Sequence, residues 1–527
     1  MNPVTPVAAP PSDWTRRIAA GLGQLRQRES QLTLVLAVVI GALVGLVVVA
    51  FILLTGRLAV HLYPADGAPW RRAVVPVLGA IVSGYLLYRY FPGARGSGIP
   101  QTKAALIIDE GRISLYTVIG KFVCCTTSLA SGIALGREGP SVQMGAGIAS
   151  VIGRRLRLSN DQVKLLLPLG GAAALAAAFN TPIAAVLFTL EEIVGDMQAP
   201  VLGAVVVSSA TAWMVLHLLL GDEPLFHVEP YQLLHPSEFV WYAALGVVGG
   251  LGSAAFVRLL LSLRRRFRRL KPTTLWWQPA VGGLVVGLMG YFVPNVMGVG
   301  YPVVEQALGG NMLLWTVVLL AVLKIVATAV CYASGNAGGI FGPSLFMGAM
   351  IGAAVGNVAH LIDPMHTAGA GAYALVGMGA LFAGVVRTPL TSVIMIFEMT
   401  RDYAIIVPLM IANLVAFFIS YKLQREPIYE ALAHQDGIHL PTTEAHGTQL
   451  RVVRAMRPVA PGVTHTPETG HLHPDHTLAD ALERMASTQR NVLPVVSRAD
   501  VSVILGEIAL ADVLRAYGFN QPSPPEP

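Results

Sequence analysis

The chain contains Ser131-Gly-Ile-Ala-Leu-Gly-Arg-Glu-Gly-Pro-Ser-Val-Gln-Met-Gly-Ala146 and repeats it, 203 positions later, as Ser334-Gly-Asn-Ala-Gly-Gly-Ile-Phe-Gly-Pro-Ser-Leu-Phe-Met-Gly-Ala349. Upstream, Gly96-Ser-Gly-Ile-Pro100 corresponds in the same way to Gly298-Val-Gly-Tyr-Pro302. Two halves interrupted by Gly and Pro at corresponding points are typical of a transporter built from repeats. In such proteins the binding site lies where the broken helices meet.

The composition places most of this chain in a lipid bilayer. Its 527 residues are 54% hydrophobic and 13% charged, whereas soluble proteins carry about 25% charged residues. Apolar runs begin with Gln31–Thr55 and recur until about Tyr421. The first run is too long, and too far from the start, to be a cleaved signal peptide. The sequence therefore predicts an all-α, multi-pass membrane protein.

Basic residues gather in two places, within residues 16–28 and within residues 264–271. The positive-inside bias predicts that both clusters face the cytoplasm. The second cluster could bind nucleic acid, but the apolar spans that flank it argue against that. The chain has three cysteines, all in apolar surroundings, which predicts no disulfide framework.

The apolar segments differ in length, and this difference is informative. Gln31–Thr55, Leu313–Ala333 and Ile405–Lys422 are long enough to cross the membrane. Other apolar stretches between Gly-Pro breaks are too short to cross roughly 30 Å of hydrocarbon. Broken helices at membrane depth are tolerated only where the freed backbone lines a cavity or is buried in protein.

Three loops carry the breaks: Gly96–Pro100, Gly136–Pro140 and Gly339–Pro343. Each places Gly and Pro just before an apolar helical run, where Pro costs no hydrogen bond and Gly permits a tight backbone. A helix start offers unpaired N–H donors and roughly half a positive charge. One such turn would indicate only a helix start. Three on a two-fold repeat favour a shared anion site that holds its ion weakly enough to release it.

Glu138 lies inside the second loop, in an apolar stretch where a carboxylate costs about 2.5–3.5 kcal/mol. A carboxylate and a chloride ion carry the same charge, so they can occupy one helix-start site in turn. Protonation would release Glu138 and link proton uptake to anion entry. The alternative is an acid that only satisfies the helix dipole. Arg137 is expected to snorkel or to form a structural pair rather than bind the ion.

These loops and the repeat closely resemble the signatures of the CLC family of chloride channels and chloride/proton exchangers. Gly-Ser-Gly-Ile-Pro and Gly-Arg-Glu-Gly-Pro match the family patterns, and Gly-Ile-Phe-Gly-Pro fits Gly-x-Phe-x-Pro. The resemblance covers residues 31–437, with repeats at about 75–200 and 278–405. It implies an inverted-repeat fold with broken helices and a homodimer with one pore per subunit. It also implies a bacterial inner-membrane location with both termini in the cytoplasm.

The resemblance also implies a role for individual residues. Chloride would be bound by the hydroxyls of Ser97 and Tyr429 and by the backbone N–H groups of Ile340 and Phe341. Glu138 would be the gate and the external proton-transfer group. Ser at position 97 resembles the chloride-preferring form, whereas nitrate-preferring relatives carry Pro. The other residues of the selectivity-filter loops are Gly96, Gly98, Ile99, Pro100, Gly136, Arg137, Gly139, Pro140, Gly339, Gly342 and Pro343.

Further charged residues lie within or beside the apolar runs. Glu191 and Glu192 end one such run, and paired acids there commonly form a solvated edge. The resemblance instead assigns internal proton transfer to Glu192; Glu191 would then wet the entrance, and its repeat mate Glu398 would be structural. Lys121 and Lys324 are repeat mates that we expect to snorkel to the interface.

The ends of the chain differ from its middle. Residues 1–30 are predicted to be a cytoplasmic tail, residues 450–518 a small α/β unit, and residues 519–527 a disordered tail. Leu493-Pro-Val-Val496 and Leu505-Gly-Glu-Ile508 resemble a single cystathionine-β-synthase (CBS) motif, which a homodimer could complete. Ala509 stands where the family's nucleotide-binding pattern has Ser or Thr, which favours a packing module over a nucleotide site.

Near these motifs, His471-x-His473-x-x-His476 lies in a polar, turn-rich segment. The three histidines could ligate a metal, but their surroundings favour a solvated loop. No metal or cofactor is expected; chloride would be both ligand and substrate, and no nucleic-acid partner is expected.

Together, the sequence predicts a proton-coupled chloride antiporter. A passive channel of the same fold, gated by voltage or pH, is the nearest alternative, and a fluoride exporter is disfavoured because fluoride-specialised relatives depart from these loops. An intramembrane enzyme is disfavoured because the spans contain no Ser-His pair, Asp-Asp pair or His-Glu-x-x-His motif. A receptor would not need an acid on the anion site.

Overall fold

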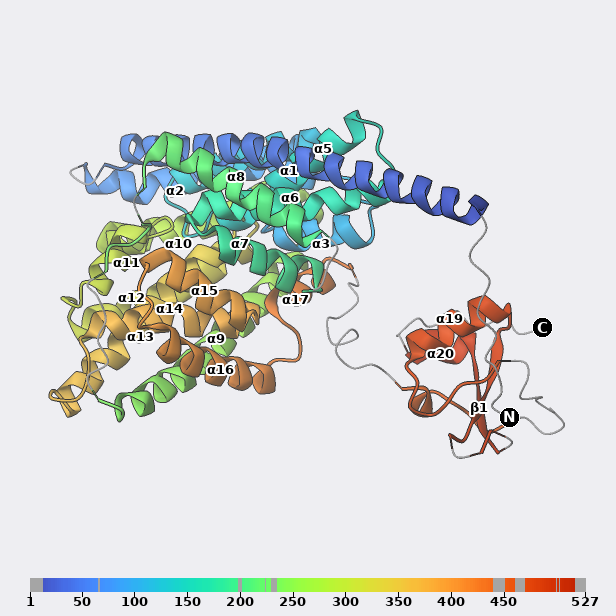
Figure 1. The fold of residues 1–527 in the computed structure, drawn as a ribbon. Helices are drawn as coiled ribbons and strands as arrows, with labels where there is room; N and C mark the ends of the chain where they lie inside the picture. The colour runs from blue at the N-terminus through green and yellow to red at the C-terminus, as the bar shows by residue number, and fades with distance from the viewer. Residues whose placement is uncertain are drawn as a thin grey trace, which may run out of the picture. The chain divides into compact units, whose positions relative to one another are not determined.

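The computed structural model describes residues 13–64, 67–197, 201–222, 224–228, 235–438, 451–459, 470–498, 500–501 and 503–516. These residues fall into two compact units, one within Met1–Leu440 and one within Pro441–Pro527 (Figure 1). The larger unit is helical throughout its described part. Eight of the described helices are long and apolar enough to cross a membrane.

The two repeats of the sequence fold into two halves with corresponding helices. The first half comprises α1 (Asp13–Leu62), α2 (Pro69–Arg89), η1 (Pro92–Ala94), α3 (Ile99–Ile107), α4 (Leu115–Ala130), α5 (Glu138–Arg155), α6 (Asn160–Phe179), α7 (Pro182–Phe188), the π-helical turn η2 (Thr189–Val194) and α8 (Leu202–Leu220). The second half comprises α9 (Glu238–Arg268), η3 (Pro272–Thr274), α10 (Gln278–Phe292), η4 (Pro294–Val296), α11 (Tyr301–Leu308), α12 (Leu314–Ala333), α13 (Phe341–Ile362), α14 (Ala370–Val386), α15 (Pro389–Thr400) and α16 (Ile406–Leu423), followed by α17 (Ile428–Gln435).

In Figure 1 the helices of the first half, blue to green, lie on one side of the larger unit, and most of those of the second half, yellow to orange, lie on the other. Helices α2 and α10 pack against each other where the halves meet. Within each half the same pairs pack, α5 with α6 and α13 with α14. The inverted-repeat, broken-helix architecture predicted from the sequence is confirmed.

Glycines allow these helix pairs to approach closely. A Cβ atom added to Gly145 of α5 would lie 2.1 Å from the carbonyl oxygen of Gly170 in α6. The repeat mates behave alike, since a Cβ on Gly348 of α13 would lie 2.4 Å from the carbonyl oxygen of Gly377 in α14. Small residues at such crossings are how membrane helices gain packing contacts that lipid does not supply.

Helix α1 begins earlier than predicted. Its backbone is helical from Asp13, so residues 13–30 continue the first long helix instead of forming a loose tail. The first twelve residues of the predicted tail lie outside the described residues.

The smaller unit contains η5 (Val452–Arg454), α19 (Leu478–Thr488), β1 (Val492–Val496), β2 (Ile504–Ala509) and α20 (Leu510–Ala516). The strands pair antiparallel, with Leu493 opposite Ile508, and both side chains are buried in the core of this unit. These elements match the predicted α/β pattern. Residue 450 and the predicted tail 519–527 lie outside the described residues.

In the same unit, the segment with His471, His473 and His476, for which the sequence favoured a solvated loop, makes hydrogen bonds with the backbone. His473 Nδ1 lies 3.1 Å from the carbonyl oxygen of Val496, and His476 Nδ1 accepts a hydrogen bond from the amide of His473. Among the described residues, no group of three or more His, Cys, Asp or Glu side chains is placed to hold a metal ion.

Candidate functional site

Two of the three loops meet at repeat-related glycines. Gly136 and Gly339 form a pair of backbone hydrogen bonds, each donating its N–H to the other's carbonyl at 2.7 Å. Two residues after each glycine a helix begins, α5 at Glu138 and α13 at Phe341. The bridge therefore holds the starts of two helices close together, where unpaired N–H groups and positive dipole ends gather.

The third loop joins them through contacts that only glycine permits. Gly98 has a φ of 110°, and a Cβ atom on it would lie 2.1 Å from the carbonyl oxygen of Gly139. A Cβ on Gly139 would lie 2.5 Å from the carbonyl oxygen of Ser97. The start of α3 is thus pressed against the start of α5, and the structure brings all three loops together.

The side chain of Glu138 lies at the start of α13. It is fully buried, and its Oε2 accepts a hydrogen bond of 3.1 Å from the amide of Gly342. Its Oε1 accepts a hydrogen bond from the hydroxyl of Tyr301. A Cβ on Gly136 would lie 2.3 Å from Oε2, so the glycine leaves room for the carboxylate. The acid therefore occupies a position that suits an anion.

Tyr301 is a site residue that we did not predict. The sequence places it in Gly298–Pro302, at the repeat position of Ile99, so the signal was a polar residue where the first half has an apolar one. The guanidinium of Arg137 lies over its ring, 5.2 Å from the centroid. Arg137 thus makes a cation–π contact, in agreement with the structural role expected for it.

Two buried hydroxyls lie near this site. Ser97 Oγ and Tyr429 OH have no hydrogen-bond partner of normal geometry among the described residues. Leaving a buried polar group unsatisfied costs about 1–3 kcal/mol, and an anion would accept a hydrogen bond from each hydroxyl. Tyr429 lies within electrostatic range of both Glu138 and Glu192, the two acids of the predicted proton route.

Ile340 and Phe341 are buried at the start of α13. Their amides precede the first full helical turn, where no carbonyl of the same helix is in reach. The ring of Phe341 packs against the rings of three other phenylalanines: Phe179 at 4.7 Å, Phe188 at 5.4 Å and Phe382 at 4.4 Å between centroids. This aromatic packing fixes the start of α13 in an apolar, water-poor environment.

Glu192 is buried in the π-helical turn η2, where it forms an ion pair. Lys103 Nζ donates to its Oε1 at 2.9 Å, and the same Nζ lies 3.9 Å from Oε1 of Glu430. Lys103 and Glu430 were not predicted. In the sequence Lys103 stands three residues after the loop Gly96–Pro100 and Glu430 stands next to Tyr429, which gave no indication that the two meet.

The neighbouring acid Glu191 makes contacts that the sequence did not predict. Its Oε2 accepts hydrogen bonds from the amide and hydroxyl of Thr391, at 2.9 and 2.6 Å, in the first turn of α15. Its repeat mate Glu398 accepts from the amides of Ile183 and Ala184, at 2.9 and 2.6 Å, at the start of α7. Each half therefore caps a helix of the other. Glu191 is thus a helix cap, a role that the sequence did not predict, and Glu398 is structural.

The prediction that Lys121 and Lys324 snorkel is wrong, because both side chains are fully buried. Each ammonium donates to two carbonyls just before a loop: Lys121 Nζ to Ala94 O at 2.9 Å and Gly96 O at 2.8 Å, and Lys324 Nζ to Val296 O at 3.0 Å and Gly298 O at 2.6 Å. These two buried lysines thus hold the loops that carry Ser97 and Tyr301.

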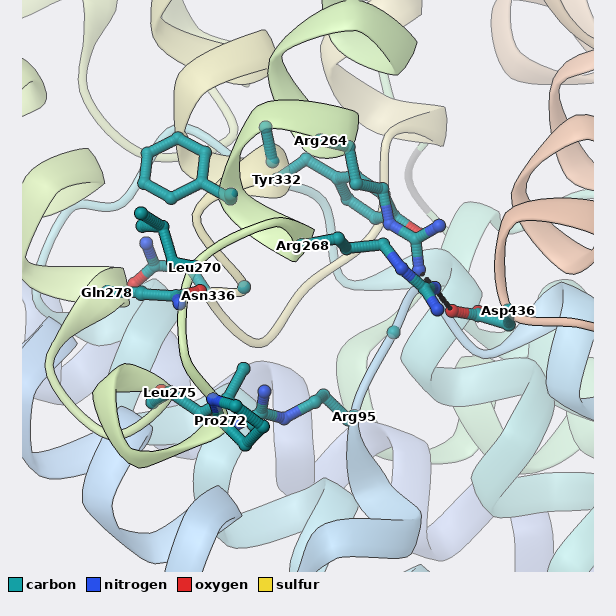
Figure 2. A pocket seen from close by; sticks show the side chains of 14 residues that line it. Arg95, Arg264, Arg268, Leu270, Pro272, Leu275, Gln278, Tyr332, Asn336 and Asp436 are labelled. Atoms are coloured by element: carbon teal, nitrogen blue, oxygen red, sulfur yellow. Dashed lines mark hydrogen bonds and ion pairs between the residues drawn. The ribbon is translucent and has the colours of Figure 1, made fainter.

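A cavity of about 270 Å³ borders the first loop at Gly96. Figure 2 shows Arg264 and Arg268 pointing toward Asp436 in this cavity, with Arg95 beside Leu275. The Arg264–Asp436 pair has a distance of 2.7 Å and Arg268 contacts the same carboxylate. Three arginines against one aspartate leave the lining basic, which suits an approach route for anions.

Comparisons with known proteins agree with this arrangement. A family model described as voltage gated chloride channel matches residues 78–421. The H(+)/Cl(−) exchange transporter ClcA of Vibrio campbellii is 34% identical over 424 residues, which cover 76% of this chain and 89% of that protein. A protein of Ralstonia nicotianae named as a ClcB-like chloride channel protein is 34% identical over 380 residues, covering 71% of this chain and 88% of its own length. The crystal structure of a slow cyanobacterial Cl⁻/H⁺ antiporter superposes with a TM-score of 0.71 at 28% identity, covering 77% of this chain and 97% of that one.

Proposed function

The chain belongs to the voltage-gated chloride channel family, and we propose that it is a secondary active exchanger that moves chloride and protons in opposite directions. The observation that carries the proposal is the placement of Glu138. Its carboxylate accepts a hydrogen bond from Gly342 at the start of α13, so a group that can carry a proton stands in a position fit for chloride.

The exchange follows from competition for this position. While Glu138 is ionised, the helix start and the Tyr301 hydroxyl hold its carboxylate and exclude a second anion. When a proton adds to a carboxylate oxygen, the side chain becomes neutral and loses its attraction to the positive end of α13. Chloride from the outer face then takes the position and continues toward the cytoplasm, while the displaced side chain releases its proton to the outer face.

We propose that chloride continues from this point toward the basic cavity bordered by Gly96, the cytoplasmic end of its path. On this path it would accept hydrogen bonds from Ser97 and Tyr429 and from the amides of Ile340 and Phe341. The hydroxyls of Ser97 and Tyr429, for which the described residues supply no hydrogen-bond partner of normal geometry, support this path. Glu192 would supply the proton from the cytoplasmic side.

We further propose a homodimer in a bacterial inner membrane, with one pore in each subunit and both termini in the cytoplasm. The basic residues of α9, which end that helix at Arg268, support the orientation by the positive-inside bias. The exchanger would need no cofactor besides the ions it carries, and it would not be an enzyme. Its substrates would be chloride and protons, and its surroundings the lipid bilayer.

The test is reconstitution of the purified chain in liposomes that hold a chloride gradient. We expect chloride movement to drive protons against their own gradient. We expect Glu138→Ala to abolish proton movement while chloride continues to cross, because the gate and its proton site are removed together. Chloride flux without any proton movement in the native chain would identify a passive channel, and the antiport proposal would then be wrong.

A further inference from the structure

Three ionisable side chains meet in the larger unit, away from the gate. Lys103 of α3, Glu192 of η2 and Glu430 of α17 are 5%, 6% and 8% exposed. The ammonium of Lys103 lies between the two acids, 2.9 Å from Glu192 Oε1 and 3.9 Å from Glu430 Oε1. The proposed function uses Glu192 and assigns nothing to the other two.

The number of charges in this cluster has a consequence. A buried charge is tolerated where an opposite charge neutralises it. One ammonium offsets one carboxylate, so with both acids ionised these three side chains carry a net charge of −1. A single proton on either acid removes that imbalance. The cluster is therefore suited to hold one proton at a time.

Other ionisable groups surround the cluster without changing this balance. The carboxylate of Glu191, next to Glu192 in η2, is held by Thr391 of α15. Tyr429 precedes Glu430 in α17 and lies within electrostatic range of Glu192. From α9, Arg264 bonds to the carbonyl of Leu432 and to Asp436 near the other end of α17.

We propose that Glu430 is a second proton-carrying residue of the internal route, and that Lys103 is the positioning residue that lets Glu192 and Glu430 share one proton. This inference rests on the proposed exchange of chloride for protons. A proton from cytoplasmic water binds the carboxylate of Glu430, while Lys103 pairs with ionised Glu192. The proton then passes to Glu192, and the ammonium pairs with the carboxylate left on Glu430.

The cluster also connects the proton to the chloride path. Glu430 follows Tyr429 directly, and Lys103 lies in the helix that begins just after Ser97. Both hydroxyls proposed to bind chloride therefore belong to segments that carry a member of the cluster. Proton binding to the cluster and chloride binding therefore involve the same two backbone segments, the start of α3 and the start of α17.

The experiment compares proton and chloride flux in proteoliposomes for Glu430→Gln, with Glu426→Gln as a matched control. Glu426 precedes α17 and its side chain is 38% exposed, paired with His434. We expect Glu430→Gln to lose uphill proton transport while chloride still crosses, and Glu426→Gln to keep the native proton-to-chloride ratio. A native ratio in Glu430→Gln would overturn the role of Glu430. If the native chain itself moves no protons, the proposed function fails instead.

Lys103 is tested by the pH profile of proton transport. Without the ammonium, the two acids hold their proton more tightly, so Lys103→Met should move the half-maximal cytoplasmic pH upward by about one unit or more. Lys103→Arg keeps the charge and should keep the native profile. A native profile in Lys103→Met would overturn the positioning role. Should Lys103→Met fail to fold, a displaced profile in Lys103→Arg would be the contrary result.

Discussion

The hydroxyl of Tyr301 provides a direct test of how the gate is held. Tyr301→Phe removes the donor that Glu138 Oε1 accepts from. The change leaves the ring in place, with its cation–π contact to Arg137 and its edge contact to Phe226, whose centroid lies 5.7 Å away. Among the residues that the structure describes, the carboxylate keeps its hydrogen bond from the amide of Gly342. The substitution therefore weakens the hold on Glu138 without rebuilding the site.

The size of the effect follows from the type of bond. A hydrogen bond to a charged group contributes about 1.5–3 kcal/mol, which corresponds to roughly a 10- to 150-fold change in an equilibrium. Chloride and the Glu138 carboxylate compete for one position, so the occupancy of that position by the gate should fall by this factor. The apparent dissociation constant for chloride should fall by up to the same factor. Its lower limit is the value reached when the Glu138 carboxylate no longer competes for the position.

Calorimetric titration of chloride into the purified protein measures this change. Glu138→Ala removes the competitor, so Tyr301→Phe should have no effect on chloride affinity in that background. Unchanged affinity in Tyr301→Phe alone would show that the hydroxyl does not hold the gate. An equal gain in both backgrounds would show that Tyr301 acts on the ion instead of on Glu138.

Two further predictions concern the loops. Ser97→Pro removes a hydroxyl and an N–H donor at the anion path, and we expect it to raise nitrate transport over chloride transport; an unchanged anion preference in a liposome flux assay would contradict this. Lys121→Met leaves the buried carbonyl of Ala94 without its donor, at about 1–3 kcal/mol, and also removes the bond to the half-buried carbonyl of Gly96. Its unfolding temperature in detergent should therefore fall well below that of Lys422→Met, an exposed control; equal unfolding temperatures would show that the buried lysine does not stabilise the loop.

The repeat made the fold predictable because Gly and Pro determine where helices can break. Gly136 and Gly339 could be paired from their spacing alone, and the structure joins them by two hydrogen bonds. Side-chain partners were not predictable in this way. Lys103 and Glu192 are 89 residues apart in sequence, and only the packing of α3 on η2 brings them together.

The buried lysines show a second limit. Lys121 and Lys324 stand in apolar runs, where sequence patterns indicate a long side chain reaching for the interface. Their actual partners are main-chain carbonyls, which carry no residue-specific signal. The capping role of Glu191 was not predicted for the same reason, since it caps a helix start in the other half.

The functional groups occupy the positions at which the two halves differ. The repeat mate of Glu138 is Phe341, and that of Glu192 is Met399. An acid at both 138 and 341 would place two negative charges beside the Gly136–Gly339 bridge, where they would repel each other and both oppose chloride. One acid facing one set of free amides avoids this conflict. The shared backbone builds a helix-start site from both halves, whereas Glu138 and Glu192, the two acids of the proposed exchange, both belong to the first half. The proposed proton route would therefore have unlike ends, with Glu138 at one end and Glu192 with Glu430 at the other.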